Sequence, residues 1–431
     1  MTERDRRDAL AYFQRGAAAQ KARRLDEAVG HYRAGLRLDP DHPQALSNLA
    51  SALRDLERDE EALAAGRRAV ELQPRSAELQ LNLGHLLLHV SDWEGAAAAF
   101  EAAAHLKPGW ADPLWDLSLA RLRQGRLGEG WDLYERRFAA NNGLVGPPMP
   151  DNRWQGEPLD GRTVAVWCEQ GVGDQIRYAA CVPDVAGRAR RTLLVAEPRL
   201  AALFQRSFPE VTAIAGDRIN APEPRAQLLA ADFHVAAGSL PRHLRRRIED
   251  FPRHRGYLRA DPERTELYRR MLDAQAPQPR VGLCWRSRLA GGRRNRFYAR
   301  IEELAPILAL PGLSFVNLQY DDSAAELAAA RTLTANPVVA LDDLDLMRDL
   351  DGAAALTAGL DLVVTVVTSV ADMAGALGVP TILLAHEDYW AMHGTSAVPW
   401  YPSCRVALRR HDQSWEPAIA AAVEMVRAAV G

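Results

Sequence analysis

The sequence is short of several features that would each assign it to a class of protein. Lys21 and Lys107 are the only lysines, and 53 basic against 56 acidic residues leave a formal net charge of −3. That balance offers no general attraction to nucleic acid or to an acidic membrane surface. No apolar run approaches the roughly 18 residues of a membrane-spanning helix. We therefore expect no membrane span and no nucleic-acid partner.

Cysteine is scarce as well. The four cysteines are scattered, with neither the spacing of a zinc site nor a pairing pattern, which fits a reducing compartment. The first residues, Met1–Asp8, are charged and lack the apolar segment of a secretion signal. Motifs for zinc hydrolases, phosphate-binding loops and serine nucleophiles are also missing. We expect a cytoplasmic protein with no bound metal and no cofactor.

The chain of 431 residues is long enough to form two or three domains. Its first third contains an internal repeat. Small residues and prolines recur every 34 positions in the first third: Gly16, Ala50 and Gly84; Ala28, Ala62 and Ala96; Pro40, Pro74 and Pro108. This period and residue pattern are the signature of tetratricopeptide (TPR) repeats. We predict a helical TPR region over residues 1–142, with units at 9–42, 43–76, 77–110 and 111–142.

Two further columns share the period. One is aromatic and should fill the space between the two helices of a unit: Tyr32, Phe100 and Tyr134. The other is polar and falls on the first helix of each unit: Gln14, Asn48, Asn82 and Asp116. First helices line the concave face of such superhelices, and a carboxamide offers a donor and an acceptor to a peptide backbone. We predict a ladder that binds a protein partner; the alternative is solvated residues or local caps.

After the repeats the pattern changes. Residues 143–160 are rich in glycine and proline and predict a linker. From residue 161 short apolar runs alternate with helical patterns, as in a parallel sheet covered by helices, and the alternation restarts after a polar helix near Pro262–Ala274. We predict an α/β region of two Rossmann-like lobes, 161–260 and 261–431, with ligands at the carboxyl ends of the strands.

The first strand of this region, Thr163–Cys168, leads into a glycine turn. Gly171, Gly173 and Gln175 surround Asp174 at the start of a helix. Glycines let a ligand approach the backbone, and the helix dipole favours an ionised aspartate, which suits a catalytic base. The alternative is an ordinary first-turn aspartate that only stabilises its helix.

In the second lobe, the strand Val281–Trp285 is followed by basic residues. Arg286, Ser287 and Arg288 come first, and Arg296 lies in the arginine-rich loop after them. Guanidinium groups at the end of a strand suit a phosphate ester. The alternative is a solvated loop, since arginine is the common basic residue throughout this chain.

Two later segments of the second lobe add candidates. Glu326 follows the next strand and either holds ribose hydroxyls or belongs to the start of a helix. Thr368 and Ser369 open a helix after another strand, where hydroxyls and free N–H groups form an anion site. An ordinary N-cap is the alternative.

Taken together, the motifs resemble those of bacterial TPR proteins that carry a C-terminal glycosyltransferase of the two-lobed GT-B fold, related to the ADP-heptose transferase family. The resemblance rests on residues 169–179, 238–241, 281–288, 315–322, 360–381 and 399–405. It implies a metal-independent, inverting transferase with an acceptor lobe at 161–260 and a nucleotide-sugar lobe at 261–431. It further implies that Asp174 is the catalytic base and that Glu326 holds ribose. The polar column resembles the asparagine ladder of TPR-bearing O-GlcNAc transferases.

One departure from the family pattern bears on the donor. Relatives commonly read Asp-Thr-(Ala/Gly)-x-x-His at the donor helix, whereas this chain has Val367 in place of the acid and Asp372 in place of the histidine. The change argues against ADP-heptose. It leaves another nucleotide sugar, such as the CMP-linked nonulosonic acid that some TPR transferases attach to flagellin, or a lobe that no longer catalyses.

We interpret the sequence as that of a protein glycosyltransferase. The repeats would hold a protein acceptor, with flagellin as one candidate in view of the resemblance, while the lobes transfer a sugar to a Ser or Thr hydroxyl. Two alternatives stay open: a transferase directed to glycans or lipids, and a TPR scaffold whose transferase region is vestigial.

Overall fold

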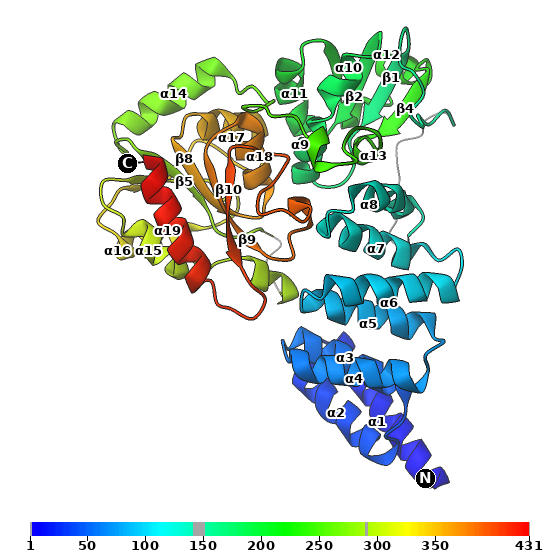
Figure 1. Ribbon diagram of the computed structural model, residues 1–431. Helices are drawn as coiled ribbons and strands as arrows, with labels where there is room; N and C mark the ends of the chain where they lie inside the picture. The colour runs from blue at the N-terminus through cyan, green and yellow to red at the C-terminus, as the bar shows by residue number, and fades with distance from the viewer. Residues whose placement is uncertain (1, 141–150, 289–291, 431) are drawn as a thin grey trace. The chain divides into compact units, whose positions relative to one another are not determined.

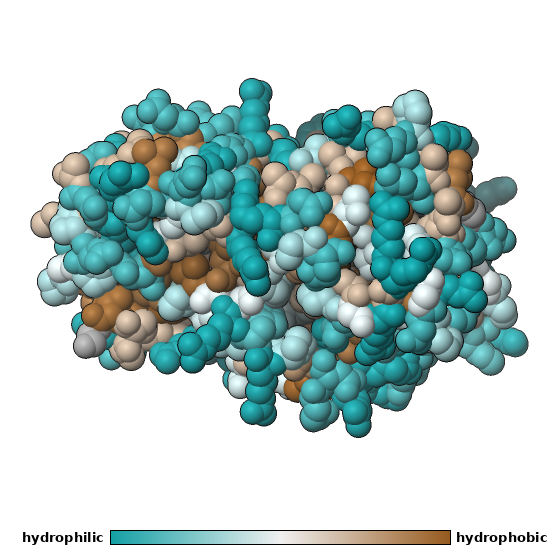
Figure 2. All heavy atoms as spheres, turned by 90° about the horizontal axis from the view of Figure 1, so that it is seen from above, coloured by the Kyte–Doolittle hydropathy of each residue, from teal (hydrophilic) through white to brown (hydrophobic). Residues whose placement is uncertain are grey.

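A computed structural model describes residues 2–140, 151–288 and 292–430. The chain divides into two compact units, Met1–Gly143 and Leu144–Gly431, and each is described by itself. Part of the linker predicted at 143–160 lies outside the described residues. Hydrophilic residues predominate on the face shown in Figure 2, and apolar residues appear there only in small patches.

The first unit consists of helices joined by short turns (Figure 1). They are α1 (Glu3–Lys21), α2 (Leu25–Leu38), α3 (Pro43–Asp55), α4 (Asp59–Leu72), α5 (Ala77–His89), α6 (Trp93–Leu106), α7 (Ala111–Arg123), α8 (Leu127–Tyr134) and the 3₁₀ turn η1 (Glu135–Phe138). Each odd-numbered helix packs on the next even-numbered one, and each pair packs on the following pair. The predicted TPR architecture is confirmed.

The repeated small residues make room for the repeated aromatic ones. Tyr32 and Phe100 are fully buried within their units. A Cβ added at Gly16 would lie 2.8 Å from the Tyr32 ring, and one at Gly84 would lie 2.4 Å from the Phe100 ring. Each aromatic ring therefore occupies the space that a side chain at the glycine would need, which explains why the two columns occur together.

This packing gives the first prediction. Gly84→Ala should destabilise the repeats by about 1–3 kcal/mol, because the buried Phe100 ring has to move to admit the methyl group. Gly30→Ala, on the exposed face of α2, is the matched control: nothing lies within 4 Å of the added Cβ, and removing a helix-interior glycine should stabilise by up to about 1 kcal/mol. Urea unfolding followed by circular dichroism measures both, and equal effects would contradict the packing argument.

The second unit contains two parallel sheets. The first has the strand order β3–β2–β1–β4 and the second the order β10–β9–β8–β5–β6–β7. The strands are β1 (Thr163–Trp167), β2 (Arg191–Ala196), β3 (Val211–Ala215), β4 (Phe233–Ala236), β5 (Arg280–Cys284), β6 (Ser314–Asn317), β7 (Val338–Val339), β8 (Leu362–Val366), β9 (Thr381–His386) and β10 (Cys404–Arg409). Strands β1, β5, β8 and β9 are buried along their whole length, as expected where helices cover both faces.

Helices separate the strands in sequence. Around the first sheet they are α9 (Val172–Ala179), α10 (Val182–Ala186), α11 (Ala201–Ser207), α12 (Pro222–Leu229) and α13 (Pro241–Leu244). Around the second they are α14 (Pro262–Asp273), α15 (Ala305–Leu308), α16 (Ala324–Leu333), α17 (Leu350–Ala358), α18 (Ser369–Leu377) and α19 (Glu416–Val430). Short 3₁₀ turns lie between these elements: η2 (Pro198–Leu200), η3 (Gly216–Arg218), η4 (Ala237–Ser239), η5 (Ile248–Asp250), η6 (Gly292–Phe297), η7 (Ile301–Leu304) and η8 (Trp390–Met392). The predicted pair of Rossmann-like lobes is confirmed.

The second sheet has a separate apolar core on each face. One core joins Val281 and Val364 of the sheet to Ile307 of α15 and Ile419 of α19. The other contains Leu272 of α14 together with side chains from α17 and α18. Within the described residues, no helix has both the length and the apolar character needed to cross a membrane.

In the two-lobed transferases that the sequence resembles, the final helix often returns to the first lobe, and the resemblance predicts the same for residues 415–430. Instead α19 packs on β9, β10 and α15 of the second lobe, as Figure 1 shows beside β10. Its apolar face, which includes Ile419 and Val426, completes the core on that side of the sheet, so the expectation was wrong.

In both sheets the strand order reverses next to a segment that the sequence marks as a candidate ligand site. In the first sheet β1 lies between β2 and β4, and in the second β5 lies between β6 and β8. Ligands of parallel α/β sheets bind beyond the carboxyl ends of strands at such a switch. The glycine turn after β1, the basic segment after β5 and Thr368 after β8 all lie at these ends.

Candidate functional site

A cavity of about 300 Å³ lies between the two lobes of the second unit. The first lobe contributes Val172 and Ile176 of α9 and Arg199 of η2. The second lobe contributes polar groups and a larger apolar wall: Ser287, Arg288, Leu318, Tyr320, Leu346, Met347, Leu350, Ala353, Thr357, Ser369, Val370 and Met373. The starts of α9 and α18 therefore open into one largely apolar space.

The turn before α9 is held by side chains on both sides. The buried carboxylate of Glu169 accepts hydrogen bonds from the backbone N–H of Gly238 at 3.1 and 3.3 Å. Gln175 accepts from the N–H of Glu197 at 2.9 Å and donates to the carbonyl of Gln170 at 3.3 Å. The structure thus joins the motif at 169–179 to the one at 238–241, and gives Gln175 a supporting role in the turn.

Gly173 makes a close approach between the lobes possible. A Cβ added there would lie 2.4 Å from Oδ2 of Asp372 and 3.4 Å from Cα of Ser369. At Gly171, the N-cap of α9, the nearest atom to an added Cβ is Oδ2 of Asp174, at an ordinary 3.6 Å. The two glycines of the turn therefore differ, since only Gly173 faces α18.

Asp174 is the third residue of α9, and its side chain is 31% exposed. It accepts a hydrogen bond from Nη1 of Arg177 at 3.3 Å. Arg177 was not singled out from the sequence, although it stands three residues after Asp174 in the same motif. Arg177 also binds Asp372, the residue that departs from the family pattern. A carboxylate in place of a histidine is a sequence signal that a cation could lie opposite it.

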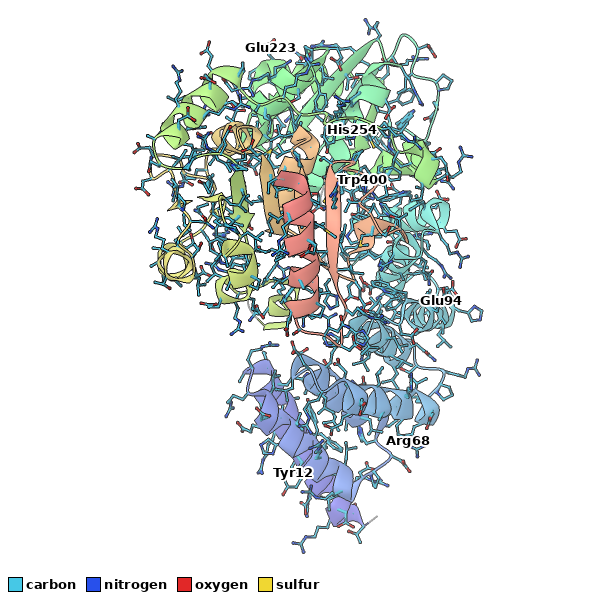
Figure 3. All side chains as sticks on the ribbon, turned by 60° about the vertical axis from the view of Figure 1, so that its left-hand side comes forward. Tyr12, Arg68, Glu94, Glu223, His254 and Trp400 are labelled. Carbon is cyan, nitrogen blue, oxygen red and sulfur yellow. The ribbon has the colours of Figure 1, made fainter. Side chains whose placement is uncertain are left out.

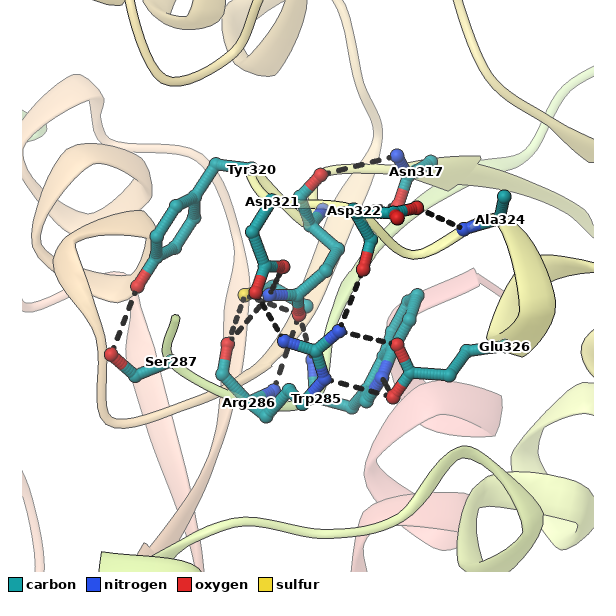
Figure 4. A network of polar contacts seen from close by, with 11 residues as sticks. Trp285, Arg286, Ser287, Asn317, Tyr320, Asp321, Asp322, Ala324 and Glu326 are labelled. Atoms are coloured by element: carbon teal, nitrogen blue, oxygen red, sulfur yellow. Dashed lines mark hydrogen bonds and ion pairs between the residues drawn. The ribbon is translucent and has the colours of Figure 1, made fainter. Parts of the chain in front are cut away.

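Arg286 and Glu326, predicted to contact different parts of a donor, instead bind each other (Figure 4). Nε and Nη2 of Arg286 donate to the two carboxylate oxygens of Glu326 at 2.8 and 2.5 Å, and Nη1 donates to Asp321. Trp285 also donates to Glu326, at 2.9 Å. Partial burial opposes ionisation of Glu326, but the bonds from Arg286 and Trp285 outweigh it and hold the pKa of Glu326 below its usual value.

Ser287 and Arg288 have a different setting from Arg286, because both line the cavity. The hydroxyl of Tyr320, also in the lining, donates to Oγ of Ser287 at 3.2 Å. Arg288 is exposed, and no ion pair joins it to another side chain that the structure describes. Of the arginines predicted to meet a phosphate, Arg288 is thus the one whose charge is available at the cavity.

Arg296 forms an ion pair with a carboxylate of the same lobe. Its Nη2 donates to the carboxylate of Asp388, which is also in contact with His386. Both Arg296 and Asp388 are largely buried, at 9% and 13% exposure. The pair joins the basic loop to the segment after β9, so the structure accounts for Arg296 without a ligand.

An anion site and a helix N-cap were the two roles considered for Thr368 and Ser369, and the structure places the two residues differently. Oγ1 of Thr368 accepts from the N–H of Val370 at 3.3 Å, so Thr368 is the N-cap of α18. Ser369 lines the cavity. The thiol of Cys284 lies 3.7 Å from Oγ1 of Thr368, and burial raises the pKa of this thiol to about 11, so it is protonated at neutral pH.

The polar column of the first unit is partly occupied by contacts within the repeats. Nδ2 of Asn82 donates to Oγ of Ser47 at 2.9 Å, and Asp116 contacts Nε2 of His85 at 2.7 Å. Oδ1 of Asn48 accepts from Gln44 at 3.1 Å, while Gln14 is exposed. Because Ser47 and Asn82 belong to α3 and α5, and His85 and Asp116 to α5 and α7, two of these contacts connect successive first helices.

No group of three or more histidine, cysteine, aspartate or glutamate residues in the described part of the chain is arranged to hold a metal ion. His393 is packed inside the protein: it is 1% exposed, and its Nε2 accepts a hydrogen bond from the Trp400 indole at 3.0 Å.

Comparison with known proteins supports the repeats directly. Two tetratricopeptide repeat families match at residues 9–42 and 43–76. Protein FlbA of Caulobacter vibrioides is 35% identical over 328 residues, which is 72% of this chain and 54% of FlbA. The chain therefore matches about half the length of that relative.

Two solved structures match this chain at low sequence identity. An O-GlcNAc transferase of Thermobaculum terrenum matches 99% of this chain and 91% of its own, with 17% identity and a TM-score of 0.36. The protein MamA matches 31% of this chain and 74% of its own, with 22% identity and a TM-score of 0.29.

The different settings of Arg286 and Arg288 give the second prediction. Arg288→Ala should weaken nucleotide binding about 10-fold, because it removes an available charge from the cavity lining, while leaving stability nearly unchanged. Arg286→Ala should instead destabilise the protein by about 1.5–3 kcal/mol, since it removes charged hydrogen bonds to Glu326 and Asp321. Calorimetric titration with CMP, UDP, GDP and ADP and thermal unfolding measure the two effects. The reverse pattern would show that Arg286 contacts the ligand.

Proposed function

We propose that this protein is a glycosyltransferase that moves a sugar from a nucleotide-sugar donor to a Ser or Thr hydroxyl of a protein docked on its TPR repeats. The observation that carries the proposal is the cavity between the lobes. It receives the starts of α9 and α18, an apolar wall suited to a nucleobase, and polar groups suited to a phosphate.

The second lobe, 261–431, would hold the donor. Apolar side chains such as Leu318 and Met373 can contact a base, and the N–H groups at the start of α18 favour negative charge. Arg288 and Ser369 lie on the same wall and can donate to a phosphate. These groups would stabilise the charge that develops on the departing phosphate.

The first lobe, 161–260, would present the acceptor and the base. Asp174 would take the proton of the acceptor hydroxyl as its oxygen attacks the anomeric carbon, and the bond from that carbon to the phosphate oxygen would break. Attack from the side opposite the leaving group inverts the anomeric centre. The chemistry in this proposal needs no metal ion, because Arg288 and the start of α18 supply the positive charge.

The ion pairs of the predicted arginines bear on how much negative charge a bound donor could carry. Arg286 and Arg296 are paired with carboxylates, which leaves Arg288 as the available guanidinium among the predicted ones. A CMP-linked sugar carries one phosphate charge at the bond that breaks, and a nucleoside diphosphate sugar carries more. A CMP-linked nonulosonic acid, whose departing group carries a single phosphate, is one candidate donor, with flagellin as one acceptor of that chemistry.

The same pairing favours one competing function. If Arg286 and Arg296 once bound a donor and now only stabilise the fold, the second unit is vestigial and the protein is a TPR scaffold. A scaffold would bind its protein partner but turn over no nucleotide sugar.

The third prediction tests the reaction itself. Asp174→Asn should leave the fold intact and lower single-turnover transfer by about 10²-fold or more, the usual contribution of a general base. The donor is found first by thermal shift, because a ligand that binds only the folded state raises its stability. No turnover by the wild type with any donor supports the scaffold. An active Asp174→Asn variant would limit Asp174 to helix stabilisation.

The fourth prediction concerns the acceptor. Changing Asn48 and Asn82 together to alanine should weaken binding of a protein acceptor by about 10-fold or more, since each amide can make hydrogen bonds worth roughly 0.5–1.5 kcal/mol net. Hydrolysis of the donor by water should hardly change. Acceptor binding by calorimetry and donor hydrolysis are measured on the same preparations.

Each rival function predicts a different result for this double variant. A scaffold loses partner binding but shows no hydrolysis in either form. A transferase directed to glycans or lipids transfers normally. Unchanged binding of a protein acceptor would mean that the repeats dock it by another face.

A further inference from the structure

Arg177 of α9 occupies the junction between the two lobes of the second unit, with its side chain 5% exposed. Nε and Nη2 donate to Oδ1 of Asp372 on α18 at 3.2 and 2.9 Å. Nη1 donates to Oδ1 of Asp174 at 3.3 Å. One guanidinium therefore links the proposed base, on the first lobe, to a carboxylate of the second lobe.

The second lobe holds this guanidinium from several directions. Tyr401 donates to the same Oδ1 of Asp372 at 2.8 Å, and Nη2 of Arg177 donates to the hydroxyl of Tyr389 at 3.2 Å. The Trp390 ring lies 5.2 Å from the guanidinium carbon. Burial raises the pKa of Asp372, and the charge of Arg177 acts in the opposite direction. An arginine bound through separate N–H groups has little rotational freedom.

The backbone around the pair is shaped for this contact. Gly173 leaves room for Oδ2 of Asp372, as described above, and α9 packs directly on α18. One residue beyond Arg177, the ring of Tyr178 meets that of Trp400 edge to face at 6.0 Å. Trp400 belongs to the second lobe and lies near His254 of the first lobe (Figure 3).

We propose that Arg177 is a positioning residue for Asp174, and that Asp372 of the second lobe is what holds Arg177 in place. The proposal rests on the function proposed above. With Asp372 as anchor, Arg177 presents one N–H to Asp174 and fixes the orientation of its carboxylate. Misplacement of a reacting group by about 1 Å can cost 10²-fold in rate. The base is thus assembled only while the lobe that holds the donor lies against α9.

A purely structural role for the same pair predicts a different outcome when both charges are removed. Breaking a buried ion pair at one end leaves an uncompensated charge and destabilises strongly, whereas removing both ends is often close to neutral. Stability should therefore recover in a double variant under either interpretation. Catalysis should recover only if Arg177 does no more than join the lobes.

The experiment compares Arg177→Met, Asp372→Asn and the double variant Arg177→Met/Asp372→Asn with the wild type. Asparagine keeps an acceptor for Tyr401. We expect the melting temperature to fall most in Arg177→Met and to recover in the double variant. In the double variant kcat for transfer should stay about 10- to 100-fold low, while KM for the donor and nucleotide affinity change less than about twofold. If Arg177→Met does not fold, the double variant still decides.

A second ion pair between the same lobes is the matched control. Arg206 of α11 donates to both carboxylate oxygens of Asp351 on α17 at 2.8 Å, and neither residue contacts Asp174. The variant Arg206→Met/Asp351→Asn should retain wild-type kcat. An equal loss of kcat in this control would mean that any weakening of the lobe contact slows the reaction, and would overturn the positioning role.

Two failures can be told apart. If the wild type and Asp174→Asn differ as expected but Arg177→Met/Asp372→Asn has wild-type kcat, the positioning role is wrong and the proposed function stands. If the wild type transfers no sugar from any donor, the proposed function falls and the positioning role falls with it.

Discussion

The close packing of α9 against α18 is the constraint on which the second unit depends. It brings the carboxyl ends of two separate sheets to one cavity, and it requires a glycine at position 173 because Asp372 occupies the space of a side chain. Further contacts act in the same direction: Arg206 binds Asp351, and Arg199 donates to the carbonyl of Met347 at 2.6 Å. The first lobe thus supplies arginines whose partners lie on the second lobe.

Neighbouring carboxylates determine which arginines of the second lobe are available to bind a ligand. Arg286 and Arg296 stand where guanidiniums would suit a phosphate, yet each lies beside a carboxylate in a partly buried setting, where charged hydrogen bonds are strong. A ligand would have to displace those bonds in order to use either charge. Arg288 differs from them only in its surroundings, and residue type alone does not reveal that difference.

In the repeats as well, the sequence pattern predicted where residues lie but not which residues they contact. Periodicity located the helices and the small residues that face Tyr32 and Phe100, because those positions are set by spacing along the chain. It also located the polar column. It did not indicate that Asn82 would bond to Ser47, or Asp116 to His85, since these partners come from neighbouring units outside the column. A bound peptide would share the column with these contacts.

The sequence by itself determined the architecture, because a repeat of fixed period and the alternation of apolar strands with helices are local patterns that constrain folding directly. The sequence also predicted that the glycine turn, the basic segment and Thr368 follow the carboxyl ends of strands. It did not place α19, whose apolar face could cover either lobe. The tertiary structure alone decided which charges are paired. It joined Asp174 to Asp372 through Arg177, because two residues almost 200 positions apart meet only when both lobes have folded against each other.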